Sequence, residues 1–334
     1  MTRVQLTEAE WEFIGPYLPI GEYGPYPERL RRQFEGVIWR FRTGGQWREM
    51  PSEFGAWSTV HNRFRQWRDA GVFEALLEGA IAEAAKRGEV DLSLVSVDST
   101  TVRAHHDAAG MHLDPDTLAD LEKAAEEAEK ARQKGGGPKE QDGQDAADDP
   151  ERDERRRVQR RRRLRLKAAL LGRSRGGQTS KVHIVGERKC RPLAIVLTEG
   201  QAADSPQFVP VLAKVRVRGP VGRPRTRPDA VAGDKAYSSR GNRAHLRQRH
   251  IKAVIPEKRD QAANRKKKGS RGGRPVGHDA ELYKDRNTVE RLINRLKAWR
   301  GIATRFDKTP KSYLAGLHLR ASMIWIRGLT KTAP

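Results

Sequence analysis

The chain has 334 residues, enough for more than one domain and a sizeable hydrophobic core. Its 66 lysines and arginines exceed its 43 acidic residues, so the formal net charge is +23. That charge predicts a polyanionic partner, because cations that neutralise phosphates release counterions. With one cysteine, Cys190, the chain can form neither an internal disulfide nor a cysteine-rich zinc site.

An anionic membrane is a poorer partner for this sequence than a nucleic acid. Binding to a membrane surface needs an amphipathic helix with a bulky apolar face, and no strong one is found. The N-terminus has no apolar signal core. The longest apolar run near the other end, Met323–Ile326, is too short to span a bilayer. We therefore expect a cytoplasmic, nucleoid-associated protein without membrane contact.

Residues 1–88 are predicted to form an all-helical domain. Thr7 can cap the first helix, and Glu10 completes a capping box. Apolar residues at helical spacing predict helices over 8–18, 27–41, 57–69 and 72–86. We expect a DNA-binding domain of the helix-turn-helix kind, with a core that includes Trp57, Phe64 and Trp67. Its candidate DNA contacts are Arg63, Arg65 and Arg68.

Residues 89–334 are predicted to form an α/β catalytic domain. Val95 and Val97 alternate with polar residues, as in a half-buried strand. Further strands are expected over 179–185, 193–197, 230–232 and 251–255, and helices over 205–217, 240–249, 280–300 and 311–327. The order is three strands, a helix, a strand, a helix, a strand and a helix. This order of elements is the order found in the ribonuclease-H-like fold, so we expect a mixed five-stranded sheet.

Two segments of this domain depart from the alternation of strands and helices. Residues 118–167 have too little apolar surface to pack, and eight arginines stand between Arg155 and Arg165. We expect a charged, partly disordered insertion there. A basic, glycine-rich loop is expected over 257–277, in which Arg265–Lys268 is either solvated or in contact with phosphate.

The helix predicted over 280–300 carries the clearest chemical pattern. Tyr283, Arg286, Glu290 and Lys297 are separated by 3, 4 and 7 residues, which places them within about 60° on one helix face. Asn294 borders that face. A single carboxylate among cationic groups suits a metal ion and a phosphate backbone together.

This spacing, Tyr-x2-Arg-x3-Glu-x6-Lys, resembles the signature of a large branch of DDE transposases. The stretch 283–291 is similar to its version in insertion-sequence family five. Val97–Val102 resembles the strand that carries the first aspartate of that family, and Ala232–Tyr237 the segment that carries the second. Thr179–His183 and Gly200–Asp204 resemble its connecting segments. The resemblance covers nearly the whole chain except about 118–167.

The resemblance implies a transposase that cleaves the ends of an insertion sequence and joins the 3′-hydroxyl ends to target DNA. Asp98, Asp234 and Glu290 would be the catalytic residues and would bind two Mg²⁺ ions, with Mn²⁺ as a substitute. Asp98 would bridge both ions. The implied partners are double-stranded DNA, as terminal inverted repeats and as target, and a second copy of the chain. The resemblance implies that Tyr283, Arg286 and Lys297 contact the DNA strand near the cut. Further candidate DNA contacts are Asn294, Lys235 and Lys181.

Other interpretations of these residues remain open. A single aspartate at a strand end is more often a turn former or a helix cap than a catalytic group. A non-catalytic, repurposed DNA-binding protein and a repair nuclease of the same fold are the alternative functions. The three intact carboxylates argue against the first and the signature helix against the second. A zinc site could be formed by His105, His106, Asp107 and His112. A structural loop or a DNA-facing segment is favoured instead, since no tight ligand spacing such as His-x3-His recurs.

Overall fold

The computed structural model describes residues 5–20, 29–109, 165–174, 176–277 and 279–331, with isolated positions between 119 and 163. Most of the charged insertion expected at 118–167 therefore lies outside the described residues. His112 also lies outside them.

The N-terminal region is helical, as predicted. Its helices are α1 (Glu8–Ile14), α2 (Leu30–Thr43), α3 (Trp57–Asp69) and α4 (Val72–Lys86). Thr7 and Glu10 form the expected capping box on α1, which ends earlier than predicted and continues as the 3₁₀ turn η1 (Gly15–Tyr17). Two further 3₁₀ turns, η2 (Trp47–Glu49) and η3 (Ser52–Phe54), connect α2 to α3. Helix α2 ends at Gly44, which has a φ of +71° that glycine adopts without strain.

A mixed sheet forms the centre of the second region. Its main strands are β1 (Val95–Ala104), β3 (Gly177–Glu187), β4 (Pro192–Glu199), β5 (Ala230–Gly233) and β6 (Lys252–Val254). They are arranged in the order β4-β3-β1-β5-β6, with β3 antiparallel to β1 and β4, and with β5 and β6 parallel to β1. This is the ribonuclease-H-like arrangement, so the predicted fold class is confirmed.

The described sheet has seven strands, where five were predicted. Strand β2 (Gly172–Ser174) pairs with the beginning of β3, and β7 (Thr304–Arg305) pairs with the end of β1. Both additions are two or three residues long, too short to show as an alternating pattern in the sequence.

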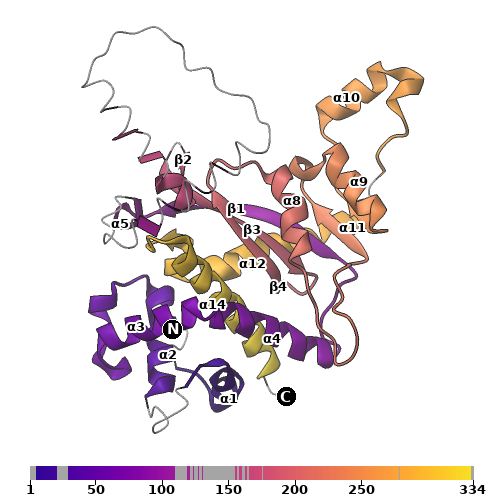
Figure 1. Cartoon of the computed structure of the whole chain (residues 1–334). Coiled ribbons are helices and arrows are strands. Elements are labelled where there is room, and N and C mark those ends of the chain that lie inside the picture. Colours follow the sequence, from indigo (N-terminus) through magenta and orange to yellow (C-terminus); the bar gives the residue numbers. More distant parts are fainter. Residues whose placement is uncertain are drawn as a thin grey trace.

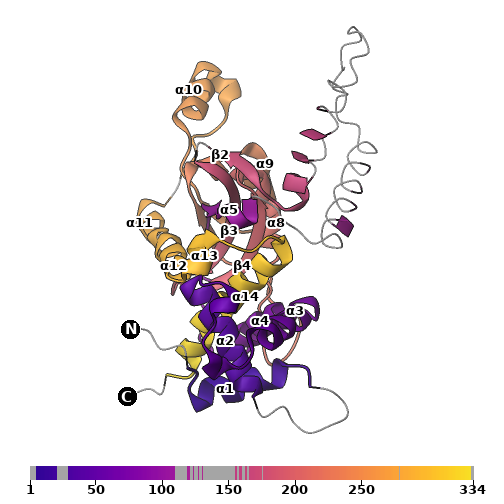
Figure 2. The ribbon, with the colours of Figure 1, turned by 90° about the vertical axis from the view of Figure 1, so that its left-hand side faces the viewer.

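Helices cover both faces of this sheet, as Figures 1 and 2 show. Helices α8 (Asp204–Ala213) and α9 (Arg240–Gln248) lie on one side, and α12 (Asn287–Lys297) lies on the other. The short helix α13 (Arg300–Ala303) and the buried helix α14 (Pro310–Leu329) follow α12. Within the described residues, no helix has the length and apolar character needed to cross a membrane.

Three predicted elements differ from the structure. Helix α8 begins at Asp204 and ends at Ala213, four residues before the end of the helix predicted over 205–217. The single helix predicted over 280–300 is divided into α11 (Ala280–Lys284), α12 and α13. Its first break arises because the amide of Arg286 bonds the carbonyl of Tyr283, three residues back, which tightens the turn. The loop predicted over 257–277 contains α10 (Arg259–Lys267) and the 3₁₀ turn η5 (Gly269–Gly272).

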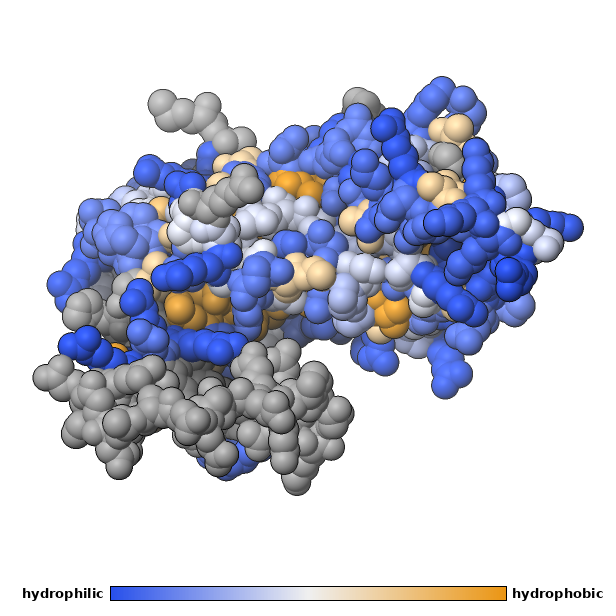
Figure 3. Space-filling view, turned by 90° about the horizontal axis from the view of Figure 1, so that it is seen from above, coloured by the Kyte–Doolittle hydropathy of each residue, from blue (hydrophilic) through white to orange (hydrophobic). Residues whose placement is uncertain are grey.

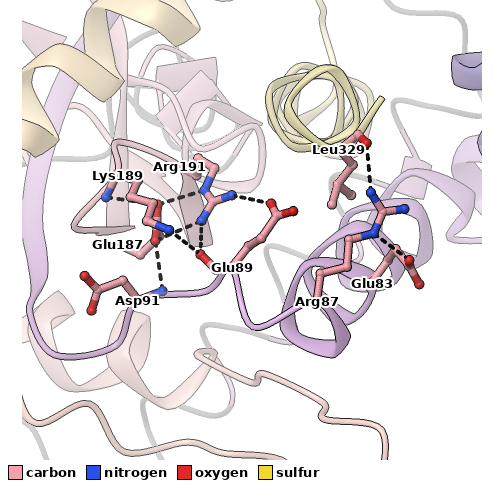
Figure 4. Close-up of polar contacts among 8 residues, drawn as sticks. All are labelled: Glu83, Arg87, Glu89, Asp91, Glu187, Lys189, Arg191 and Leu329. Carbon is pink, nitrogen blue, oxygen red and sulfur yellow. Dashed lines mark hydrogen bonds and ion pairs between the residues drawn. The ribbon is translucent and has the colours of Figure 1, made fainter. Parts of the chain in front are cut away.

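The N-terminal helices share a hydrophobic core with α14. Helix α4 packs along α14, and the Phe41 ring lies so close to Gly316 that a Cβ there would overlap it. Arg87 Nη1 donates to the carbonyl of Leu329 at 2.8 Å (Figure 4). The boundary at residue 88 stays a prediction, but the helices before it are packed against the rest of the chain.

A buried ion pair holds the linker that follows α4. Glu187, at the end of β3, has no exposed surface and accepts from Arg191 Nε at 2.9 Å (Figure 4). Its other oxygen accepts from the amide of Asp91 at 3.1 Å. Arg191 also lies over the ring of Trp325, with its guanidinium carbon 4.0 Å from the ring centroid. The β3–β4 turn, the linker and α14 are therefore joined at one point.

Candidate active site

The pairing of β1 with β5 brings two of the predicted carboxylates together. In this parallel pair Val97 lies opposite Gly233, so Asp98 and Asp234 follow at the same end of β5. Asp234 begins the 3₁₀ turn η4 (Lys235–Tyr237), and its carboxylate accepts from the amide of Ala236. The strand register, not a contact between the side chains, sets this arrangement.

Helix α12 carries the third carboxylate, that of Glu290, and Arg286 links it to Asp98. Arg286 Nη2 donates to Asp98 Oδ2 at 2.9 Å, and Arg286 Nη1 donates to Glu290 Oε1 at 3.0 Å. One guanidinium thus joins a residue of β1 to a residue of α12. The side chains of Asp98 and Arg286 are 17% and 18% exposed, whereas Glu290 is 51% exposed and faces solvent.

The electrostatics of the site reflect three carboxylates around one cation. Burial raises the pKa of Asp98, and Asp234 and Glu290 raise it further, against the amide of Ser99 and the charge of Arg286. Burial opposes the charge of Arg286, but the neighbouring carboxylates, with Asp98 foremost, raise its pKa overall. Bringing three carboxylates together is unfavourable without positive charge among them.

Besides Arg286, two other predicted DNA contacts on the signature segment are partly buried. Tyr283 is on α11 and packs against a small apolar cluster of Leu94, Ala230, Ala232 and Val254. Lys297 Nζ donates to the carbonyl of Thr101 at 3.2 Å, and burial lowers the pKa of Lys297. Asn294 and Lys235 are exposed, and Lys235 directly follows Asp234. Arg286 and Glu290 share one side of α12, as predicted, but Tyr283 lies beyond the break.

The candidate contacts outside this segment have varied surroundings. Lys181 Nζ lies 3.1 Å from Asp204 Oδ1, and Arg68 Nη1 donates to Ser312 Oγ of α14 at 2.9 Å. Arg63 is half-buried, and Arg65 is exposed.

The aromatic residues of α3 were predicted to be core residues, and a zinc site was weighed for the histidine cluster. Phe64 and Trp67 are core residues, but Trp57 is 39% exposed and lies under the guanidinium of Arg48, so its assignment to the core was wrong. The side-chain ligand atoms of His105, His106 and Asp107 lie within 4.8 Å of one another.

The predicted basic loop is a projecting helix. Helix α10 extends from the body in Figures 1 and 2, and none of its residues is buried. Arg265 is paired with Glu257 at 3.0 Å, while Lys266, Lys267 and Lys268 are exposed. Figure 3 looks down on this end of the molecule and shows hydrophilic side chains over most of the coloured surface.

Sequence reasoning assigned no role to Ser99 and Asp204, which lie directly behind Asp98. Ser99 donates its amide to Asp98 Oδ1 at 2.8 Å and its hydroxyl to Asp204 Oδ1 at 2.7 Å. The available signal was strand alternation, which requires Ser99 to face the side of the sheet opposite to Asp98.

Two known family models together match most of the chain. A model described as the transposase DDE domain matches residues 90–324, and one described as a putative transposase of the IS4/5 family matches residues 6–77. The chain belongs to the DDE transposases. The carboxylates of Asp98 on β1, Asp234 after β5 and Glu290 on α12 thus lie within the residues matched by the DDE domain of this family.

Curated relatives agree with this assignment. A putative transposase of insertion element IS6501 from Brucella ovis is 31% identical over 149 residues, which are 45% of this chain and 99% of the relative. A putative transposase of IS402 from Burkholderia cepacia is 32% identical over 146 residues, or 43% of this chain and 62% of the relative. A solved Mos1 transposase paired-end complex aligns with 94% of this chain and 82% of its own, at 12% identity and a TM-score of 0.23.

Proposed function

We propose that this DDE transposase binds the terminal inverted repeats of an insertion sequence, cleaves phosphodiester bonds at the element ends and joins the 3′-hydroxyl ends to target DNA. The observation that carries the proposal is the convergence of Asp98, Asp234 and Glu290 from β1, the end of β5 and α12. Two copies of the chain would act together, one for each element end.

The three carboxylates fit a pair of divalent cations. Their oxygens are the donors that Mg²⁺ and Mn²⁺ prefer, and the side chain of Arg286 supplies positive charge to Asp98 and Glu290. When bound, the ions would activate the attacking water or 3′-hydroxyl and stabilise the leaving oxygen. Asp98, Asp234 and Glu290 would hold them.

The chain's own cations would hold the DNA. Arg286 lies between Asp98 and Glu290, and Lys235 is exposed beside Asp234. Both can contact phosphates close to the bond that is cut. The exposed lysines of α10 can contact the duplex farther from the site, and these phosphate contacts position the DNA without reading its sequence.

The test separates cleavage from binding. Asp98→Asn, Asp234→Asn and Glu290→Gln should each abolish cleavage, in Mg²⁺, of a labelled duplex that carries the inverted repeat flanking the gene. Each should still bind that duplex in Ca²⁺. The matched control is Asp229→Asn, which alters an exposed aspartate at the other end of β5, where it pairs with Arg225. Cleavage by any of the three variants at the control's rate would contradict the proposed triad.

The same experiment distinguishes the proposed transposase from the two alternative functions. A repurposed DNA-binding protein would bind the duplex but would not cut it in Mg²⁺ or Mn²⁺, even as wild type. A repair nuclease would cut without preference for the repeat and would give no strand-transfer products.

A further inference from the structure

A polar cluster lies on the face of the sheet opposite to α12, directly behind the candidate active site. In the antiparallel pair of β1 and β3, Ser99 lies opposite His183, and Thr101 lies opposite Lys181. Residues two apart on a strand share a face, so Ser99, His183 and Lys181 project to the same side. Asp204, at the first turn of α8, lies above them.

Asp204 is the centre of this cluster. Its Oδ1 accepts from the hydroxyl of Ser99 at 2.7 Å and lies 3.1 Å from Lys181 Nζ. Lys181 also donates to the carbonyl of Ala202 at 2.7 Å, which fixes the ammonium beside the carboxylate. Both ends of the Ser99–Asp204 hydrogen bond are thus held in place, one by β1 and the other by α8 and Lys181.

The other neighbours of Asp204 are uncharged. His183 has no exposed surface, and its Nε2 lies 2.9 Å from Thr198 Oγ1. Burial lowers the pKa of His183 to about 4, so the ring is neutral near pH 7. The nearly buried Tyr237 keeps its phenolic proton, because burial and then Asp204 raise its pKa. Among the described residues, Lys181 therefore supplies the positive charge within 4 Å of Asp204.

Ser99 connects this cluster to Asp98. Its amide donates to Asp98 Oδ1 at 2.8 Å, while Arg286 occupies the other oxygen, Oδ2, at 2.9 Å. The Asp98 carboxylate is thus held from two sides, and only the contact with Arg286 occupies space on the side of α12. A group behind a metal ligand that fixes its orientation changes metal affinity or activity by about 10–100-fold when removed.

We propose that Asp204 is a positioning residue that orients the Asp98 carboxylate for metal binding through Ser99. This rests on the proposed function, since it assumes that Asp98 binds a divalent cation. The chain from Asp204 through Ser99 to Asp98 makes α8, and not only α12, part of the catalytic apparatus. It also gives Lys181 the role of counter-ion to Asp204, in place of the direct DNA contact predicted for it from the sequence.

The test measures Mn²⁺ binding to the free full-length protein by electron paramagnetic resonance, without DNA or turnover. Ser99→Ala and Asp204→Ala should each raise the Mn²⁺ dissociation constant by about tenfold or more. The double variant should be no weaker than the single ones, because both remove the same connection. Asp204→Asn keeps an oxygen that can accept from Ser99 and should recover most of the affinity. Ser322→Ala, which removes a buried hydroxyl of α14, is the matched control.

Failure of the proposed function and failure of the positioning role give different results in this experiment. If Asp98→Asn binds Mn²⁺ as well as wild type does, the proposed function and the positioning role are both overturned. If Asp98→Asn loses binding while Ser99→Ala and Asp204→Ala keep it, the positioning role alone is overturned. Effects that multiply in the double variant, or an Asp204→Asn variant as weak as Asp204→Ala, also overturn it. Circular dichroism melting of each variant shows whether a loss of affinity comes from unfolding, and Ser99→Ala is the variant least disruptive to the fold.

Discussion

Arg286 binds Asp98 and Glu290 with the two ends of a single guanidinium, at 2.9 and 3.0 Å. These are two of the three carboxylates that would hold the metal ions. Under the proposed function, the same side chain has two competing uses, as a counter-ion for these carboxylates and as a contact to DNA phosphate.

Arg286→Ala should have opposite effects on the two ligands. Without DNA, loss of the competing charge should strengthen Mn²⁺ binding by about tenfold or more, because a unit charge about 4 Å away contributes from about 1 kcal/mol in water to about 4 kcal/mol near a protein surface. Duplex affinity should fall, and the slope of log K against log salt should flatten by about 0.9. Electron paramagnetic resonance and fluorescence anisotropy measure the two effects, with Arg225→Ala as control. Weaker Mn²⁺ binding would show that Arg286 supports the carboxylates instead of competing for them.

The lysines that end and follow α10 should provide sequence-independent affinity for DNA. Replacing Lys266, Lys267 and Lys268 by alanine should flatten the salt slope by about 2.7, at about 0.9 for each phosphate that is no longer neutralised. Cleavage at saturating DNA should be unchanged. Anisotropy titrations with a duplex of arbitrary sequence at several salt concentrations measure the slope. The control replaces Lys284, which pairs with Glu281. An unchanged slope would mean that α10 does not touch the duplex.

Glu187 should be among the most sensitive positions for stability. Glu187→Ala removes the nearer and fully buried carboxylate of Arg191 and leaves only the contact with Glu89 at 3.6 Å among the described ion pairs. Breaking a buried pair in this way typically costs about 3–5 kcal/mol. Urea unfolding followed by tryptophan fluorescence measures the loss. The matched control is Glu281→Ala on α11, where the side chain is 82% exposed and the pair with Lys284 contributes at most about 1 kcal/mol. Equal losses in the two variants would contradict a structural role for the buried pair.

Acid should destabilise the protein through His318 of α14. Burial, and then Lys214, lowers the pKa of His318 to about 4, against an ordinary value of 6.5. The contribution of neutral His318 to the free energy of unfolding is therefore fully present above pH 6.5. It is lost as the pH drops toward 4, because over this range only the unfolded chain takes up the proton. The loss by pH 5 is about 2 kcal/mol.

Comparing wild type with His318→Leu isolates this effect, since His183 titrates equally in both proteins. Urea unfolding at pH 7.5 and pH 5 should show a smaller difference for the variant. The control His106→Leu alters a side chain that is 83% exposed and should leave the wild-type difference unchanged. A His318→Leu variant with the full wild-type difference would rule out His318 as the source.

Removing residues 1–88 should destabilise the remainder instead of releasing an independent domain. Helix α14 would no longer pack against α4 and Phe41, and apolar residues that are now buried would face water. The fragment starting at residue 89 should melt at a lower temperature and aggregate on size-exclusion chromatography. Co-expression with residues 1–88 should restore a soluble complex. A monomeric fragment that melts as the full chain does would show that the N-terminal helices are separable.

The sequence alone determined the helices and strands that are marked by a pattern of neighbouring residues. The apolar spacing placed α3 and α4 at their observed bounds, and Thr7 with Glu10 marked the start of α1. The order of strands and helices was enough to predict the ribonuclease-H-like sheet. Asp98, Asp234 and Glu290 were picked out by family resemblance, because no property of a single carboxylate distinguishes it from a turn former.

Only the tertiary structure decided which distant groups meet. Arg286 bonds Asp98, which is 188 residues away in the sequence, and Ser99 bonds Asp204, which is 105 residues away. Strand register and helix placement bring each pair together. The same holds for Glu187, whose burial depends on Arg191 and on the linker at Asp91. Charged residues look alike in a sequence whether they face solvent or a buried partner. Their roles follow from packing, which no local periodicity encodes.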